Sequence, residues 1–186
     1  MSSESQPTEK PMPARDRIID VAGPLFYREG YRAIGVDRVI AEAGVAKATF
    51  YKHFPAKDDL IVAWIARSEE RSGKSLPPVD GPLPLIAYAD HMIDIAGKVW
   101  CMGCTYQGTA AEFSDPAHPA HAAALGVKRR VIAQLQLRAQ NQGLPDAQAH
   151  AERVFLFLEG VWAATRMFGA KAPLTHAKDA IRKLIG

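Results

Sequence analysis

The sequence predicts an all-α protein with a small N-terminal head and a larger helical body. Apolar residues recur at the three- and four-residue spacing of amphipathic helices along most of the chain. No alternating β-branched run and no Asn-Gly hairpin turn is present, so strand signals are almost absent. The proline-rich segment Leu76–Pro84 interrupts the helical pattern and marks the best internal boundary.

The N-terminal part begins with a polar, proline-bearing segment, residues 1–13, which we expect to be a disordered tail. A first helix is predicted over Ala14–Glu29, and Gly30 ends it. Pro24 lies inside this helix and is expected to weaken or kink it locally, because proline removes one backbone donor.

The next segment reads as two short helices joined by a tight turn, within a predicted head domain of residues 14–56. The helices are Val36–Ala43 and Lys47–His53, and Gly44 is expected to take the left-handed conformation that ends the first. Phe50 and Phe54, four residues apart, face inward. A polar face held in this way has the shape needed to enter a DNA major groove, and its side chains are Lys47, Thr49, Tyr51, Lys52 and His53.

A connecting segment, residues 57–75, follows the head and contains a longer helix of about Lys57–Gly73. Residues 76–186 form the predicted helical body. Its helices are expected at Leu85–Trp100, with Val99 on the apolar face, and at Gly103–Phe113, Ala120–Gln142, Asp146–Phe168 and Thr175–Ile185.

The helix over residues 146–168 is apolar almost all the way round, which indicates burial on more than one side. In a domain this small, we expect one of those sides to meet a second subunit. The helix over residues 120–142 has apolar rows that could pair with it. Together they predict an isologous four-helix interface in a homodimer.

About the first 70 residues resemble the TetR family of bacterial transcriptional regulators. The matching segments are LFYREGY from Leu25 to Tyr31, VIAEAGV from Val39 to Val45 and TFYKHFPAKDDL from Thr49 to Leu60. The body resembles that of TetR proteins with a Gly-Cys turn and a Glu-Phe-x-Asp-Pro segment, which here are Gly103-Cys104 and the residues 112–116.

The resemblance implies a homodimeric repressor that a small organic ligand releases from a palindromic double-stranded DNA operator, with residues 76–186 as the ligand-binding and dimerisation domain. No cofactor is expected. The resemblance also implies that the polar face of the second short helix meets DNA, with Thr49 or Tyr51 at phosphate or a thymine methyl and Lys47 or Lys52 at guanine or phosphate. Lys57 and Arg38 are further candidates for phosphate contacts. Gly35 and Ala46 depart from the family pattern, since Ser or Thr is common at both positions.

The body is expected to carry the ligand pocket, and its mixture of aromatic and polar residues suits a mostly apolar organic ligand. Glu159 is notable because it interrupts the most apolar helix. Three roles stay open for it: a polar anchor in the pocket, a partner at the dimer interface, or an exposed group. The candidate lining residues are His91, Met92, Ile95, Trp100, Tyr106, Phe113, Glu159 and Trp162.

Two cysteines and two histidines form the pattern CxxC followed by HxxH, at Cys101, Cys104, His118 and His121. Zinc can bind such ligands, but the histidine spacing is one residue short of the usual range, so no metal site is predicted. A redox-responsive regulator that senses oxidants through Cys101 and Cys104 is the alternative function, if these thiols are exposed and low in pKa.

Composition limits the other classes of protein. The hydrophobic fraction of 48% supports a real core, and no apolar run approaches the about 20 residues of a membrane span. The N-terminus has no apolar signal core, so we expect a cytoplasmic protein with reduced cysteines. The net charge is only +3, so local charge placement carries the prediction of DNA binding. No catalytic constellation is present, and the protein is not expected to be an enzyme.

Overall fold

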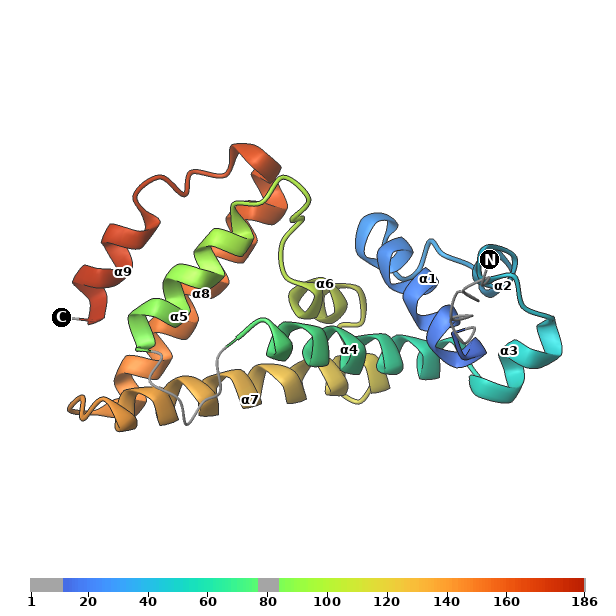
Figure 1. The fold of residues 1–186 in the computed structure, drawn as a ribbon, viewed down its shortest axis with the longest axis horizontal. Coiled ribbons are helices and arrows are strands. Elements are labelled where there is room, and N and C mark those ends of the chain that lie inside the picture. The colour runs from blue at the N-terminus through green and yellow to red at the C-terminus, as the bar shows by residue number, and fades with distance from the viewer. Residues whose placement is uncertain (1–11, 77–83, 186) are drawn as a thin grey trace, which may run out of the picture.

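The computed structural model describes residues 12–76 and 84–185, and within these ranges the chain is helical and contains no strand. The predicted all-α fold class is confirmed. Its helices, seen in Figure 1, are α1 (Ala14–Glu29), α2 (Val36–Ala43), α3 (Lys47–His53), α4 (Lys57–Lys74), α5 (Leu85–Ala96), α6 (Thr105–Glu112), α7 (Pro119–Asn141), α8 (Ala147–Phe168), the short 3-10 helix η1 (Gly169–Lys171) and α9 (Ala177–Ile185).

The molecule is elongated, with α1, α2 and α3 grouped at one end and α5, α8 and α9 at the other (Figure 1). The long helices α4 and α7 run side by side along its length and connect the two ends. Most of the predicted N-terminal tail and of the segment Leu76–Pro84 lies outside the described residues. The predicted domain boundaries remain predictions.

The head has a continuous apolar core beneath α3. Phe50 and Phe54 are fully buried there with Phe26 and Ile18, as the helical spacing predicted. Gly44 takes the left-handed conformation, with φ 60° and ψ 44°, and the turn after it carries Val45 into the angle between α2 and α3. The predicted helix-turn-helix geometry is therefore confirmed.

Helix α1 runs unbroken through the exposed Pro24, so the helix tolerates that proline. Next to it, Gly23 permits a close approach of α1 and α4. A Cβ atom at Gly23 would lie 2.2 Å from the Trp64 ring. The absence of a side chain at this position thus brings the head helix directly against the connecting helix.

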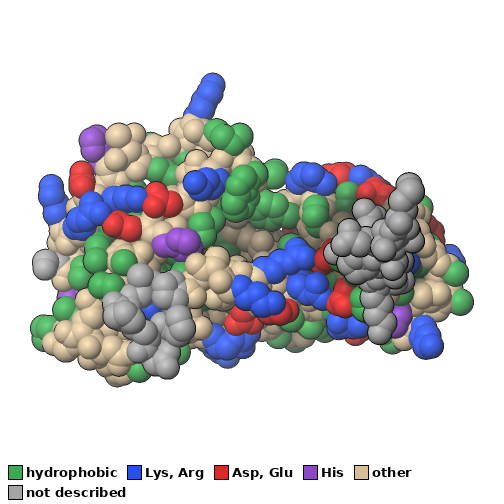
Figure 2. Space-filling model, viewed as in Figure 1, with side chains coloured by type: hydrophobic (Ala, Val, Ile, Leu, Met, Phe, Trp, Pro, Cys, Tyr) green, Lys and Arg blue, Asp and Glu red, His purple; other side chains and the backbone are tan. Residues whose placement is uncertain are grey.

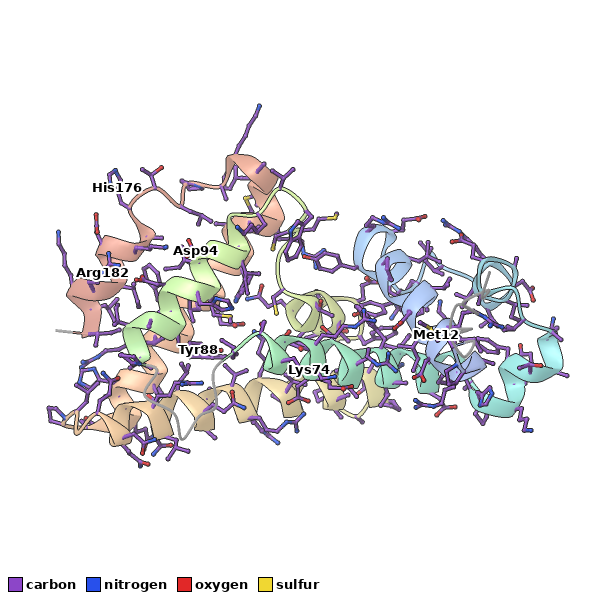
Figure 3. All side chains as sticks on the ribbon, in the orientation of Figure 1. Met12, Lys74, Tyr88, Asp94, His176 and Arg182 are labelled. Carbon is purple, nitrogen blue, oxygen red and sulfur yellow. The ribbon has the colours of Figure 1, made fainter. Side chains whose placement is uncertain are left out.

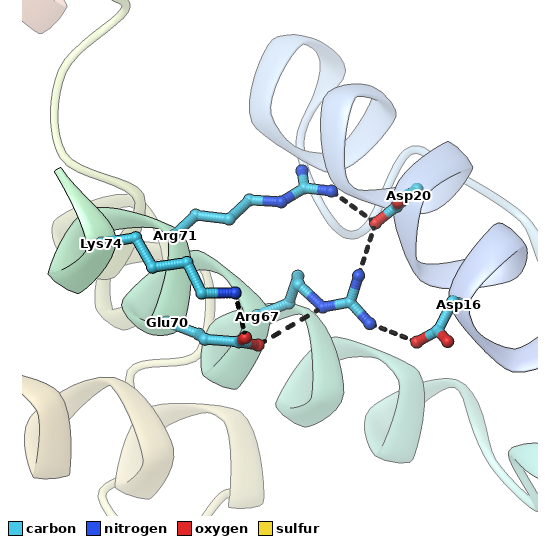
Figure 4. Close-up of polar contacts among 6 residues, drawn as sticks. All are labelled: Asp16, Asp20, Arg67, Glu70, Arg71 and Lys74. Carbon is cyan, nitrogen blue, oxygen red and sulfur yellow. Dashed lines mark hydrogen bonds and ion pairs between the residues drawn. The ribbon is translucent and has the colours of Figure 1, made fainter.

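A network of ion pairs also holds α1 to α4 (Figure 4). The Arg67 guanidinium pairs with Asp16 and, at 3.1 Å, with Asp20. Arg71 reaches the same Asp20 oxygen at 2.7 Å. Since Arg67 contacts two successive turns of α1, the head and α4 are expected to move together.

The body is built on the pair α7 and α8, with α5 and α9 packed on α8. Leu135, Val154 and Leu158 lie in its buried core together with Leu85 of α5. Figure 3 shows Asp94 on α5 and Arg182 on α9 at the end of the molecule far from Met12 of the head. Ion pairs of 2.6 Å join Lys178 to Asp94 and Arg182 to Asp90, so α9 is attached to α5.

The predicted helix from Leu85 to Trp100 is too long, because α5 ends at Ala96. Gly97 follows, where helix propensity is low, and the Cys101 amide closes a turn on the Lys98 carbonyl at 2.9 Å. Val99 and Trp100 therefore lie in a loop, 86% and 66% exposed, and not on an apolar helix face. Apolar side chains gather at the surface in the region of this loop (Figure 2).

Candidate nucleic-acid interface and effector pocket

The outer side of α3 carries the polar residues that the sequence predicted. Lys47 and Lys52 are exposed, and Tyr51 is 44% exposed although its ring packs edge-on against Phe50 at 5.3 Å. Thr49 and His53 are half-buried at the margins of this face. We call Lys47, Thr49, Tyr51, Lys52 and His53 the α3 face.

Two of the predicted cationic contacts are engaged with acidic side chains of the head. Arg38 pairs with Glu29 at 2.6 Å and with Glu42 at 2.8 Å. These hydrogen bonds from Arg38 lower the pKa of the Glu29 carboxyl, and they raise the pKa of the guanidinium. Lys47 lies 3.2 Å from Asp37. Arg38 would have to exchange two partners to reach a phosphate, so its predicted role gains no support from the geometry.

Lys52 differs from Arg38 and Lys47, because it makes no ion pair with any residue in the ranges 12–76 and 84–185. Lys57, at the start of α4, is half-buried, and that burial lowers the pKa of its ammonium. The Asp59 carboxylate accepts the Ala56 N–H at 2.8 Å and completes the N-terminal turn of α4. The most available positive charge on the α3 face is therefore that of Lys52.

One side of α6 is hydrogen-bonded to the end of α1. The Glu112 carboxylate accepts the backbone N–H of Tyr31 at 3.0 Å and that of Arg32 at 2.9 Å. Thr109 donates to the Tyr31 hydroxyl at 2.8 Å, and burial raises the pKa of that hydroxyl to about 12. The Tyr27 hydroxyl donates to the Gly103 carbonyl at 2.8 Å. We call this set of contacts the α1–α6 junction.

The α1–α6 junction borders a cavity of about 220 Å³. Residues 26–31 of the head form much of its wall, and the rest comes from Thr105, Gly108, Glu112 and Arg166. Sequence reasoning missed this junction, because Glu112 is separated from Tyr31 by 81 residues and no local pattern links them.

The opposite side of α6 lines a second, half-open pocket of about 130 Å³. Here Lys128 of α7 forms an ion pair with Glu159 of α8, and Gln107 donates to the same carboxylate at 2.8 Å. We call this the Lys128–Glu159 pocket, and its lining is Tyr106, Gln107, Ala110, His121, Ala124, Leu125, Lys128 and Glu159.

Only two of the predicted ligand-binding residues, Tyr106 and Glu159, meet in that pocket. Met92 is buried in the core of the body, where the half-buried Ile95 and Trp162 pack against the same cluster. His91 is half-buried on α5, and its buried Nε2 atom has no hydrogen-bond partner among residues 12–76 and 84–185.

Two predicted pocket residues lie elsewhere. Trp100 is in the exposed α5–α6 loop, because α5 ends before it. Phe113 belongs to the core of the head, because α6 ends just before it and its ring packs on Tyr31 at 5.8 Å and stacks on His118 at 4.3 Å. Lys128 and Gln107 were missed, although an acidic residue in an apolar helix indicated that a partner should exist.

The cysteines do not match the requirements of a thiol sensor or a zinc ligand set. Cys101 and Cys104 are both buried and form no disulfide, whereas a reactive thiol has to be accessible. His118 lies 3.4 Å from Asp58, and His121 donates to the Phe113 carbonyl at 2.7 Å. Within the described ranges, no three His, Cys, Asp or Glu residues are grouped closely enough to hold a metal ion.

Comparison with known proteins agrees with this geometry. Residues 18–64 match the model of the bacterial regulatory proteins of the tetR family. The repressor KstR of Rhodococcus jostii is 40% identical over 72 residues, which cover 37% of this chain and 34% of that protein. The match spans about a third of the length of the curated relatives.

Among the solved structures that are similar over nearly the whole chain are two from Streptomyces. A TetR-type regulator from Streptomyces avermitilis is 29% identical with a TM-score of 0.75, covering 92% of this chain and 99% of that one. A TetR-family regulator from Streptomyces coelicolor is also 29% identical, with a TM-score of 0.79 and coverage of 92% and 94%. The chain belongs to the TetR family of transcriptional regulators. Within the described ranges, no helix has both the length and the apolar character that crossing a membrane requires.

Proposed function

We propose that this protein is a homodimeric transcriptional repressor that binds a palindromic DNA operator and is released from it by a small organic ligand. The observation that carries the proposal is the α3 face, whose exposed Lys52 and Tyr51 stand on a helix anchored by the buried Phe50 and Phe54. A rigid helix with polar groups on its outer side suits docking in a major groove.

The α3 face offers contacts of two kinds. Lys52 can reach a guanine edge or a phosphate, and Tyr51 and Thr49 can donate to phosphate or contact a thymine methyl. Lys47 and His53 lie at either end of the helix, where they would meet the two flanking phosphate strands. Lys57 is proposed to contact a phosphate near the N-terminus of α4, whose dipole favours an anion.

Dimerisation would place two α3 faces on one DNA duplex, and an exposed stripe on α8 supports it. Leu156 and Met167 are 68% and 78% exposed, and the exposed Gly160 and Ala163 lie between them at helical spacing. Small residues between large ones allow two helices to approach closely. We propose that α8, flanked by α7, forms this interface with a second copy.

The route from ligand to DNA is proposed to run through α6. Gln107 on one side of this eight-residue helix contacts Glu159, and Glu112 on the other side contacts Tyr31 and Arg32 of the head. A ligand that shifts α6 would therefore shift α1. The two α3 faces would then no longer match successive major grooves, which lie about 34–36 Å apart.

Footprinting and fluorescence anisotropy with the DNA upstream of the protein's own gene test the proposal. We expect protection of a palindrome, binding by two chains or a multiple of two, and affinity that falls steeply with salt because cationic contacts displace counterions. A random duplex of equal length is the control. Equal affinity for both duplexes at 150 mM salt would exclude an operator in that region.

A further inference from the structure

The ammonium group of Lys128 occupies a place with the chemistry of a cation-binding site. Its Nζ atom lies 5.8 Å from the ring centre of Tyr106 and 5.6 Å from that of Phe155. The third neighbour is the carboxylate of Glu159, with which it forms the ion pair. Two aromatic rings and a carboxylate around one position attract any ammonium, because the ring faces carry negative charge density.

The carboxylate of this site is held independently of Lys128. Gln107 donates from Nε2 to Glu159 Oε2 at 2.8 Å and to the Glu159 backbone carbonyl at 3.1 Å. Lys128, in contrast, reaches the site on a flexible four-carbon stem from α7. The lysine can therefore withdraw by rotation of its side chain while Glu159 stays in place.

The Lys128–Glu159 pocket provides room beside the ion pair. Its volume is about 130 Å³, it is half-open, and its apolar wall comes from Ala110, Ala124 and the exposed Leu125. A small aliphatic or aromatic group attached to an ammonium would rest against this wall, with its charge directed at Glu159.

We propose that the effector is an organic ammonium compound whose charged group replaces that of Lys128 at Glu159, so that Lys128 acts as an internal competitor. The inference rests on the proposed function, since it names the class of the effector. An anionic effector is disfavoured because it could reach Lys128 only beside the carboxylate of Glu159, which Gln107 holds in place.

The exchange would act on α6 directly. Departure of the Lys128 ammonium removes its contact with the ring of Tyr106, which neighbours Gln107 on the same helix. Because Glu112 at the end of α6 binds the head, a change in the position of α6 reaches the α1–α6 junction.

The test uses the full chain without DNA and the probes benzylamine, benzyl alcohol and benzoate, which share a ring and differ in charge. Ligand-observed NMR should detect benzylamine at the wild-type protein, weakly, and neither of the other two. Lys128→Met removes the competitor and should tighten benzylamine binding at least tenfold, and Glu159→Gln should abolish it. Lys171→Met, which changes an exposed lysine of η1, should leave the affinity unchanged.

The wild-type protein alone shows whether the pocket prefers a cationic or an anionic probe, so the inference stays testable if Lys128→Met does not fold. Binding of benzoate in place of benzylamine, or absence of benzylamine binding to the wild-type protein, would overturn the inference. Operator binding is measured separately without any amine. A failure there would reject the proposed function and leave the result for benzylamine standing.

Discussion

Helices α3 and α8 both expose one face, but with opposite chemistry. On α3 the exposed residues are polar or cationic, with Lys47, Tyr51 and Lys52 among them, and the apolar residues are buried beneath. On α8 the exposed stripe includes Leu156, Gly160, Ala163 and Met167. The solvated cations suit a phosphate backbone, whereas a contiguous apolar stripe marks a surface that another protein covers.

The two exposed faces also differ in whether a partner is needed to cover apolar residues. The α3 face needs no partner for its own folding, because Phe50 and Phe54 secure it to the head. The apolar residues of the α8 stripe lie outside the buried core of the body and are exposed in the single chain. The proposed function therefore gives DNA recognition to the head and dimerisation to the body, with α6 between them.

A charged substitution in the α8 stripe should have the largest effect on operator affinity. Leu156→Glu places a charge in the proposed interface without altering the core, since Leu156 is exposed in the single chain. We expect a monomer in light scattering and a loss of operator affinity of about 100-fold or more, because the second half-site is no longer bound intramolecularly. Val99→Glu, at an apolar loop residue that is even more exposed than Leu156, should remain a dimer. An unchanged mass for Leu156→Glu would exclude this stripe as the interface.

Changes on the α3 face should have an intermediate effect. Lys52→Ala and Tyr51→Ala should each weaken operator binding by about 1–3 kcal/mol, and Lys52→Ala should reduce the salt slope by about 1. Melting temperatures should stay close to that of the wild type, because both side chains are exposed. Lys183→Ala on α9 is the control. Wild-type affinity in anisotropy for both α3 variants would remove this face from the proposal.

The connection between the head and α6 can be weakened at Glu112. Glu112→Gln replaces a carboxylate oxygen by an NH2 group that faces a backbone N–H, so one donor of Tyr31 or Arg32 loses its acceptor. We expect a loss of about 1–3 kcal/mol in the free energy of unfolding, measured with urea. Glu152→Gln on α8 should change stability little, because Glu152 is exposed. Equal stabilities of the two variants would contradict the role given to Glu112.

The smallest effect concerns the acidic side chains around Arg38. Arg38→Gln should raise the pKa of the Glu29 carboxyl towards its ordinary value, as NMR titration can measure. Because folding lowers this pKa, the contribution of the pair is present at neutral pH and is lost as pH falls through it. The pKa of Glu70, which Lys74 lowers, should stay where it is. A simultaneous shift of both would indicate a general change in the protein and not a local one.

The head could be predicted in detail because its determinants are local. The left-handed Gly44, the burial of Phe50 and Phe54 and the bounds of α1, α2 and α3 all follow from spacing over a few residues. The end of α5 was less predictable. Val99 and Trp100 continue an apolar pattern, but Gly97 and the turn that follows it place them in a loop.

The sequence by itself determined the fold class, the helix-turn-helix and the side chains of the α3 face, because helical periodicity and glycine conformation act over short distances along the chain. Only the tertiary structure decided that Glu112 holds the turn after α1, across 81 residues, and that Lys128 pairs with Glu159, across 31. Those contacts depend on the angles at which α1, α6, α7 and α8 pack. The packing is a property of whole helix faces, which no local pattern encodes.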